Sequence, residues 1–228
     1  MDSPSRRSSP PGFIEKDARK TLLFIEERLR GTLPGLSAQL VMAPFPRPGD
    51  QTYLDVGERC HKAGVLLLLY PRQEQLYFLL TKRTDKVFHH RGQVSLPGGE
   101  QLPSETPVQA ALRETEEELG TSMPGGEILG LLTPLYIPPS NYCIYPVVAS
   151  IPHPPECRPR SEEVAEVIEV SLAHLLDPPR ALREIRTMGG KAVEVPFYAF
   201  GGHRVWGATA MVLAEFAGLF MRRGRKRN

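Results

Sequence analysis

The sequence predicts an α/β or α+β sandwich, in which helices pack against a β-sheet. Three observations support this fold class. Two apolar runs, Gly64–Tyr70 and Gln75–Thr81, are separated by a short polar turn, as expected of paired strands. Apolar residues recur at helical spacing near the N-terminus. A second helix with clear start and stop signals follows the strands, over residues 107–119.

The N-terminal third divides into a tail, a helix and a connection. Residues 1–14 are rich in Ser, Pro and Arg, and we expect a disordered tail. Residues 15–59 are expected to hold one amphipathic helix, which ends near Gly31, and then an irregular connection rich in Pro and Gly. The apolar face of that helix, at spacings i, i+4, i+7 and i+11, consists of Ala18, Leu22, Ile25 and Leu29.

We expect the main domain at residues 60–222, followed by a basic tail at residues 223–228. After the helix at 107–119, strands are expected near residues 128–136, 142–151, 183–188 and 192–200. A short helix is expected at Leu172–Leu176. The last helix, at about Ala208–Arg222, is apolar nearly all round and ends in arginines, which suit a helix C-terminus.

Length and composition limit the classes of function. The chain has 228 residues, with 41% hydrophobic and 24% charged residues, as in an ordinary globular protein with a real core. The net charge of +2 gives no argument for nucleic acid or an anionic membrane as a partner. The apolar runs are too short or too interrupted to span a bilayer, and no secretion signal is present, so we expect a cytoplasmic protein.

Three cysteines, Cys60, Cys143 and Cys157, show no paired spacing. They form neither a C-x-x-C metal pattern nor a disulfide framework. We therefore expect three free thiols in a reducing compartment.

The helix at 107–119 carries its own boundary signals. Thr106 is the expected N-cap, Pro107 suits the first position, and Gln109 completes a capping box. Gly120 is the expected stop. One face, expected to pack on the sheet, consists of Val108, Ala111, Leu112, Thr115 and Leu119. The Thr115 hydroxyl is expected to bond to the Ala111 carbonyl.

A second face of this helix carries carboxylates. Glu114, Glu117 and Glu118 lie on adjacent turns of that face, whereas Glu116 points toward water. Three such carboxylates offer hard oxygen ligands to Mg²⁺ or Mn²⁺, which can bridge to phosphates and acidify a bound water. Acidic runs are more often simply solvated helix faces, so further observations must decide between the two interpretations.

Residues around the cluster favour the metal site. Arg113 is embedded among the glutamates, and Glu105 precedes the helix, where it can pair with Arg113. Gly98 and Gly99 permit another group to approach the backbone closely. A solvated acidic face would need none of these features.

The full spacing G-x5-E-x7-R-E-x-x-E-E-x-G resembles the Nudix box. It is met by Gly99, Glu105, Arg113, Glu114, Glu117, Glu118 and Gly120. The resemblance implies a Nudix-like α/β/α sandwich with a mixed sheet. It also implies metal ligation by Glu114, Glu117 and Glu118, with Arg113 and Glu105 bracing the loop and helix. Thr115 and Thr121 stand where the family usually has apolar residues, a departure that should leave the metal site intact.

The segment Leu79–Gly99 resembles a second pattern, L-L-T-x-R-S-x-x-L-x-x-H-x-G-x-x-x-F-P-G-G, of the coenzyme A pyrophosphatase branch of Nudix enzymes. Conservative departures occur at Thr84, Val87 and Leu96. The resemblance implies substrate binding by Arg83, His90, Gly98 and Gly99. The cations clustered in this segment suit a substrate with a diphosphate and a separate ribose phosphate. The alternatives are a solvated basic loop and, for His90, a role in stabilising the loop.

Nudix enzymes often place a further carboxylate outside the box, as a ligand or general base. Glu163 is the candidate in this chain. The competing interpretation is an exposed acidic turn, which is the commoner fate of a charge run.

Together the resemblances imply metal-dependent hydrolysis of the diphosphate of coenzyme A or its derivatives, giving 3′,5′-ADP and 4′-phosphopantetheine. A second hypothesis keeps the box but changes the substrate to ADP-ribose, NADH or a nucleotide-capped RNA end. A third is a non-catalytic Nudix-fold binding module. Such a module would be expected to lose box carboxylates, and all of them are present here. A homodimer is a state that the sequence allows.

Overall fold

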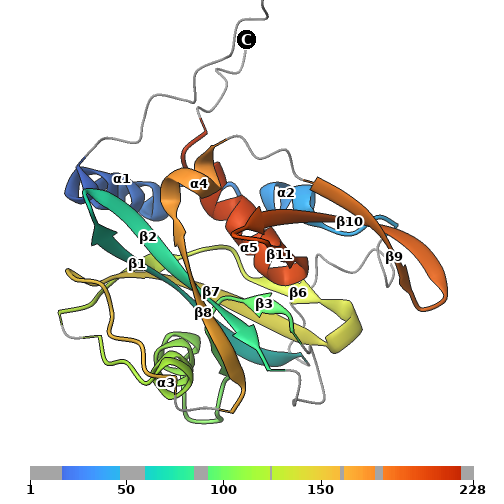
Figure 1. The fold of residues 1–228 in the computed structure, drawn as a ribbon, viewed down its shortest axis with the longest axis horizontal. Helices are drawn as coiled ribbons and strands as arrows, with labels where there is room; N and C mark the ends of the chain where they lie inside the picture. Colours follow the sequence, from blue (N-terminus) through green and yellow to red (C-terminus); the bar gives the residue numbers. More distant parts are fainter. Residues whose placement is uncertain are drawn as a thin grey trace, which may run out of the picture.

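The structure, a computed structural model, describes residues 17–46, 60–84, 92–123, 125–159, 162–177 and 182–221. A mixed sheet of eight strands forms the centre, and helices cover both of its faces (Figure 1). A smaller sheet of three strands lies at one end. The predicted α/β/α sandwich with a mixed sheet is confirmed.

The described helices include three short ones that the sequence did not predict. The α-helices are α1 (Ala18–Arg30), α2 (Leu36–Gln39), α3 (Pro107–Leu119), α4 (Leu172–Leu176) and α5 (Gly207–Gly218), and the 3₁₀ helices are η1 (Leu40–Met42) and η3 (Pro138–Ser140). Helices α2, η1 and η3 are the three that were not predicted, whereas α1, α3 and α4 lie where expected. The last helix is shorter than expected, because the Leu219 N–H bonds to the Phe216 carbonyl and tightens the final turn at Gly218.

The main sheet is built on the predicted hairpin. Strands β1 (His61–Arg72) and β2 (Gln75–Arg83) pair antiparallel, and β1 pairs in parallel with β7 (Tyr142–Ser150). The other strands are β3 (Val94–Ser95), β4 (Gly98–Glu100), β5 (Glu127–Leu131), β6 (Leu135–Ile137) and β8 (Val164–Ser171). Strand β4 pairs with β1, while β3 and β8 pair with β2. Strand β4, which contains Gly98 and Gly99, therefore lies beside the start of β1 and next to α3.

Alternation along β1 divides the core into two layers. Leu67 and Leu69 pack in the layer that holds α1 and α5. Leu66 and Leu68 pack in the layer that holds α3. Because successive strand side chains point to opposite faces, a continuous apolar run is the pattern of a strand buried on both sides. This is why the run at 63–70 predicted its strand correctly.

The region before the main domain contains more structure than expected. Asp17 caps α1, and α2 and η1 occupy part of the predicted irregular connection. Gln39 fixes α2 to α5 through a 2.7 Å bond from its Nε2 to the fully buried Glu215. The predicted tails at residues 1–14 and 223–228 lie outside the described residues.

The smaller sheet consists of β9 (Leu182–Met188), β10 (Lys191–Phe200) and β11 (His203–Trp206), all antiparallel. The β9–β10 hairpin turns at Gly189 and Gly190, whose φ angles of 56° and 76° suit glycine. Tyr198 and Phe200, in the second half of β10, belong to the core that contains α5. The turn end of the hairpin projects from the body of the molecule (Figure 1).

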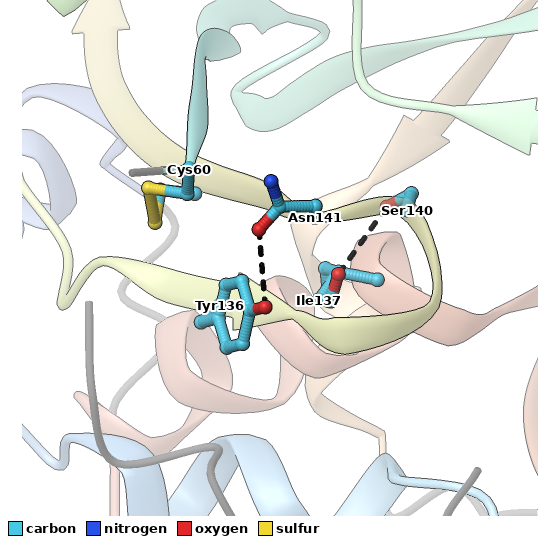
Figure 2. The surroundings of a disulfide bond; sticks show 6 residues. Cys60, Tyr136, Ile137, Ser140 and Asn141 are labelled. Atoms are coloured by element: carbon cyan, nitrogen blue, oxygen red, sulfur yellow. Dashed lines mark hydrogen bonds between the residues drawn. A yellow bond between two sulfur atoms is a disulfide. The ribbon is translucent and has the colours of Figure 1, made fainter. Parts of the chain in front are cut away.

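The expectation of three free thiols is wrong. Cys60 and Cys143 form a disulfide with a Cα–Cα distance of 5.7 Å, beside the turn that joins β6 to β7 (Figure 2). Parallel pairing of β1 with β7 brings the two residues together across a sequence separation of 83. No local spacing could have signalled that pairing. Cys157 is a free thiol, and burial raises its pKa.

Among the described residues, no helix is both long enough and apolar enough to cross a membrane.

Candidate active site

The helix α3 begins and ends as its sequence predicts. The Thr106 hydroxyl accepts the Gln109 N–H at 3.3 Å, and the Gln109 side chain accepts the Thr106 N–H at 2.8 Å. This is the complete capping box. Gly120 ends the helix with a left-handed φ of 59°. Thr115 is buried, and its hydroxyl donates to the Ala111 carbonyl at 2.6 Å, so a polar residue is accommodated on the packed face.

Close packing against β1 fixes the position of α3. A Cβ atom at Gly64 of β1 would overlap the Pro107 carbonyl at the start of the helix. Only glycine allows the first turn of α3 to approach the strand this closely. The sequence analysis missed this role, although a lone glycine within an apolar strand was a signal for it.

The Gly98–Gly99 backbone lies directly against the carboxylate face. A Cβ at Gly99 would overlap the Glu114 carboxylate, and one at Gly98 would overlap the Gly64 carbonyl. The Gly98 N–H donates to Glu118 Oε2 at 3.3 Å. The prediction that these glycines permit close backbone approach is confirmed in geometry. Their role in binding substrate stays a prediction.

Arg113 organises the outer part of the cluster. Its Nε and Nη2 bond to both Glu105 oxygens, at 2.6 and 3.1 Å. Its Nη1 donates to Glu114 at 2.7 Å and to Glu117 at 3.3 Å. The predicted pairing of Arg113 with Glu105 is therefore present. Hydrogen bonds from Arg113 and from the Leu102 N–H lower the pKa of Glu105, which keeps this carboxylate charged.

Arg113 also ties the helix to the glycine strand. Its Nη2 donates to the Glu100 carbonyl at 3.1 Å. The same guanidinium thus contacts the loop before α3, two carboxylates of α3 and the backbone of β4. The resemblance implied that Arg113 braces the loop and helix, and this set of bonds has the geometry for that role.

The four glutamates of α3 differ in environment. Glu118 is only 8% exposed, whereas the Glu117 side chain is 61% exposed. Glu114 is partly buried, and Glu116 is exposed as predicted. Glu116 is therefore on the exposed side as predicted, Glu117 is exposed as well, and Glu118 is the deepest of the four.

Glu118 has an unusual electrostatic position. Burial, with a smaller contribution from nearby Glu114 and Glu163, raises its pKa to about 7 against the lowering effects of the Gly98 N–H and Arg83. A buried carboxylate with this little compensation favours a cation or a proton as its partner.

Strand β8 brings a second polar group to the same place. Glu163 lies in the turn before β8, and its carboxylate accepts from Arg83 Nη2 at 2.9 Å. The Glu163 carbonyl also accepts the Thr84 N–H at 2.7 Å. The Arg83 Nε is buried and lacks a hydrogen-bond partner among the described residues. This N–H is therefore a donor available for an anion near Glu118.

Sequence reasoning chose Glu163 but missed the strand that positions it. Pairing of β2 with β8 sets Arg83 opposite Val164, next to Glu163. The β-branched content of residues 164–170, with Val or Ile at four of the seven positions, was the signal for this strand. His90, the other predicted substrate contact, lies outside the described residues.

The donor set fits a divalent metal in its chemistry. Carboxylate oxygens are the ligands that Mg²⁺ and Mn²⁺ prefer, and the lack of a Cβ at Gly99 leaves room for the Glu114 carboxylate beside the β4 backbone. In the described part of the chain, no three carboxylate, imidazole or thiol groups converge as a preformed metal centre. Arg113 bonds to Glu114 and Glu117 instead. Glu118 differs from the other two predicted ligands in that its hydrogen-bond partner is the Gly98 N–H and not the Arg113 guanidinium.

A profile described as the NUDIX domain matches residues 61–188, more than half of the chain. The chain belongs to the NUDIX family. The matched region contains α3, the Gly98–Gly99 strand and Glu163, so the groups assembled above all lie inside the NUDIX domain.

Relatives of this NUDIX protein span most of its length. A protein named mitochondrial coenzyme A diphosphatase NUDT8, from Homo sapiens, is 39% identical over 84% of this chain and 76% of its own length. One named peroxisomal coenzyme A diphosphatase NUDT7, from Mus musculus, is 34% identical over 60% of each chain. One named uncharacterized Nudix hydrolase NudL, from Yersinia enterocolitica, is 31% identical over 75% of this chain and 85% of its own length.

Proposed function

We propose that this protein hydrolyses the diphosphate of coenzyme A or its derivatives, with Mg²⁺ or Mn²⁺, giving 3′,5′-ADP and 4′-phosphopantetheine. One observation carries the proposal: the buried Arg83 N–H has no hydrogen-bond partner in the described part of the chain, and it lies in the neighbourhood of the buried Glu118 carboxylate. A phosphate needs cationic donors, and a metal needs carboxylates, so the pair suits a metal-bound phosphate substrate. The names of two relatives, both coenzyme A diphosphatases, support the choice of diphosphate.

The metal ligands in this proposal are Glu118, Glu114 and Glu117. When bound, the metal supplies charge neutralisation at the diphosphate and acidifies a water. Arg113 positions Glu114 and Glu117 through its bonds of 2.7 and 3.3 Å, and Glu105 positions Arg113. Arg83 donates to a phosphate oxygen and, together with Glu163, forms the side of the site opposite α3.

Proton transfer requires a carboxylate near the attacked phosphorus. Glu163 is the proposed general base, because it lies beside Arg83 and close enough to Glu118 to influence its pKa. A glutamate of α3 is the other candidate. Gly98 and Gly99 are proposed to let the substrate pass close to the backbone of β4, and His90 to contact the substrate from the preceding segment.

A substrate panel tests this proposal. The purified chain is incubated with Mg²⁺ or Mn²⁺ and coenzyme A, dephospho-coenzyme A, ADP-ribose or NADH, and products are resolved by chromatography. We expect coenzyme A to give the highest kcat/KM, with 3′,5′-ADP as a product. Faster turnover of ADP-ribose or NADH would contradict the substrate assignment. No turnover of any diphosphate would contradict hydrolysis altogether and favour a binding module.

Two further assignments stay predictions. A cytoplasmic location is tested by cell fractionation, and the two diphosphatase relatives are named mitochondrial and peroxisomal. The proposed partner is the small-molecule substrate, with no role for nucleic acid.

A further inference from the structure

The β9–β10 hairpin presents an open strand edge. The small sheet has the order β11-β10-β9, and no strand among the described residues pairs with the outer side of β9. The hairpin projects from the body of the molecule (Figure 1), and four of the seven residues of β9 are exposed: Leu182, Arg183, Ile185 and Thr187. Two large apolar side chains on β9 are exposed, Ile185 at 68% and Leu182 at 45%. An edge of this kind is a template for pairing with another strand.

Hydrogen bonds on the far side of β10 show which backbone groups of β9 face outward. Glu194 of β10 exchanges two backbone bonds with Phe45, at 2.7 and 2.8 Å, on the side away from β9. Its partner in β9 is Ile185. Because bonded and non-bonded pairs alternate in an antiparallel ladder, the N–H and C=O of Ile185 point outward.

The same alternation applies two residues away on either side. Arg183 and Thr187 also present their N–H and C=O groups to the open edge, while Glu184 and Arg186 bond to β10. Pro196, the partner of Arg183, has no N–H. This agrees with the alternation, because the Arg183–Pro196 pair is one of those without hydrogen bonds between β9 and β10.

The outward edge is complementary to itself. In an antiparallel pair centred on Ile185, each chain places Glu184 opposite Arg186 of the other, so opposite charges meet twice. The remaining opposed pairs are Ile185 with Ile185, Arg183 with Thr187, and Leu182 with Met188. The outward N–H and C=O groups fall opposite one another and can form about six backbone hydrogen bonds. Both charged side chains are already held in place. Arg186 stacks 4.3 Å from the Trp206 ring centre. Glu184 bonds to both Arg186 and Arg204 of its own chain.

We propose that the occupant of this edge is a second copy of the chain, which joins two three-stranded sheets into one through an antiparallel β9–β9 pair. With a two-fold axis, contacts are reciprocal: if one residue of the first chain lies opposite another residue of the second, the reverse pair also forms. The pairing of Glu184 with Arg186 satisfies this condition. An unrelated strand would gain the backbone bonds but would have no reason to match this pattern. A strand edge is smaller than a standard interface of about 1,600 Å², so we expect dimerisation in the micromolar range.

Amide exchange resolves this interface residue by residue. Sedimentation equilibrium of the full chain, from about 1 to 500 µM, first gives the monomer–dimer equilibrium. Hydrogen exchange is then followed at both ends of that range. We expect the amides of Arg183, Ile185 and Thr187 to exchange at least about tenfold more slowly in the concentrated sample. The amides of Glu184 and Arg186, which bond to β10, are the internal control and should not change.

Variants give an independent test. Ile185→Pro removes an outward N–H without removing a bond to β10, so we expect a monomer with unchanged diphosphatase activity and folding. Glu184→Arg sets like charges opposite each other across the β9–β9 pair and should also give a monomer. Circular dichroism checks that each variant is folded. A monomeric wild type at every concentration, or a dimer that folded Ile185→Pro and Glu184→Arg variants leave intact, would overturn the proposal.

Discussion

Two buried glutamates in this molecule have opposite surroundings. Glu215 of α5 is fully buried, and its oxygens accept from Gly35, Gln39 and Thr133, including a 2.6 Å bond from the Thr133 hydroxyl. Glu118 of α3 is almost as buried but accepts one long backbone bond. A carboxylate that the protein surrounds with donors holds the fold together, whereas one left short of donors is available to a ligand. The difference in partners, and not in burial, is the reason for proposing Glu118 as a metal ligand.

The largest effect is expected on catalysis, when Glu118 is replaced. Glu118→Gln keeps the shape of the side chain but removes a proposed metal ligand, so we expect coenzyme A hydrolysis to fall by about 1000-fold. Glu116→Gln, two residues away on the exposed flank, is the matched control and should stay within about twofold of wild type. Equal losses in both variants would mean that the burial of Glu118 has no bearing on function.

For Glu215 we expect the opposite result: a loss of stability without a loss of activity. Glu215→Gln places an amide NH₂ against the buried donors of Gln39 and Thr133, and we expect the free energy of unfolding to fall by about 3 kcal/mol. The kcat of the folded variant should not change. Denaturant titration measures the loss, with the exposed Glu27→Gln as the control. A fully stable Glu215→Gln variant would contradict the structural role.

The pH dependence of stability sharpens the comparison further. Because the folded pKa of Glu118, about 7, lies above its ordinary value of 4.5, the folded metal-free chain binds the extra proton more tightly. The resulting stabilisation is complete below about pH 4.5 and is lost as the pH rises through 7, by up to about 3 kcal/mol. Denaturant titrations in chelator, from pH 4.5 to 8, should show this decline in wild type. The decline in the free energy of unfolding should be smaller in Glu118→Gln. If the free energies of the two proteins differ by the same amount at every pH, Glu118 is not the source of the decline.

The smallest expected effect concerns the cation beside Glu118. Arg83→Lys retains the positive charge but loses the Nε–H and the planar fork, so we expect kcat/KM for coenzyme A to fall by about tenfold. Arg72→Lys, at the far end of the β1–β2 hairpin, is the control. Wild-type kinetics in Arg83→Lys would show that the unpartnered N–H does not meet the substrate.

Sequence patterns predicted the regions whose structure is decided locally. The caps of α3, the phase of its glutamates and the Thr115–Ala111 bond all depend on residues within a few positions of each other. The pairing of Arg113 with Glu105 spans only eight residues. Each of these could be deduced before any fold was known.

Features that depend on sheet pairing could not be predicted in the same way. The Cys60–Cys143 disulfide follows from the parallel pairing of β1 with β7. The donors around Glu215 come from segments 82 to 180 residues away in sequence. Since several strand orders are compatible with the same strands, periodicity alone does not specify which of these residues meet.

Metal binding by the two α3 variants tests the central claim most directly. Mn²⁺ is titrated into wild type, Glu118→Gln and Glu116→Gln without substrate, and binding is followed by calorimetry and by the shift in melting temperature. We predict that wild type and Glu116→Gln bind Mn²⁺ and gain stability, whereas Glu118→Gln loses at least about tenfold in affinity. Unchanged Mn²⁺ affinity in a folded Glu118→Gln variant would contradict the claim that the buried, under-compensated carboxylate is the one reserved for the metal.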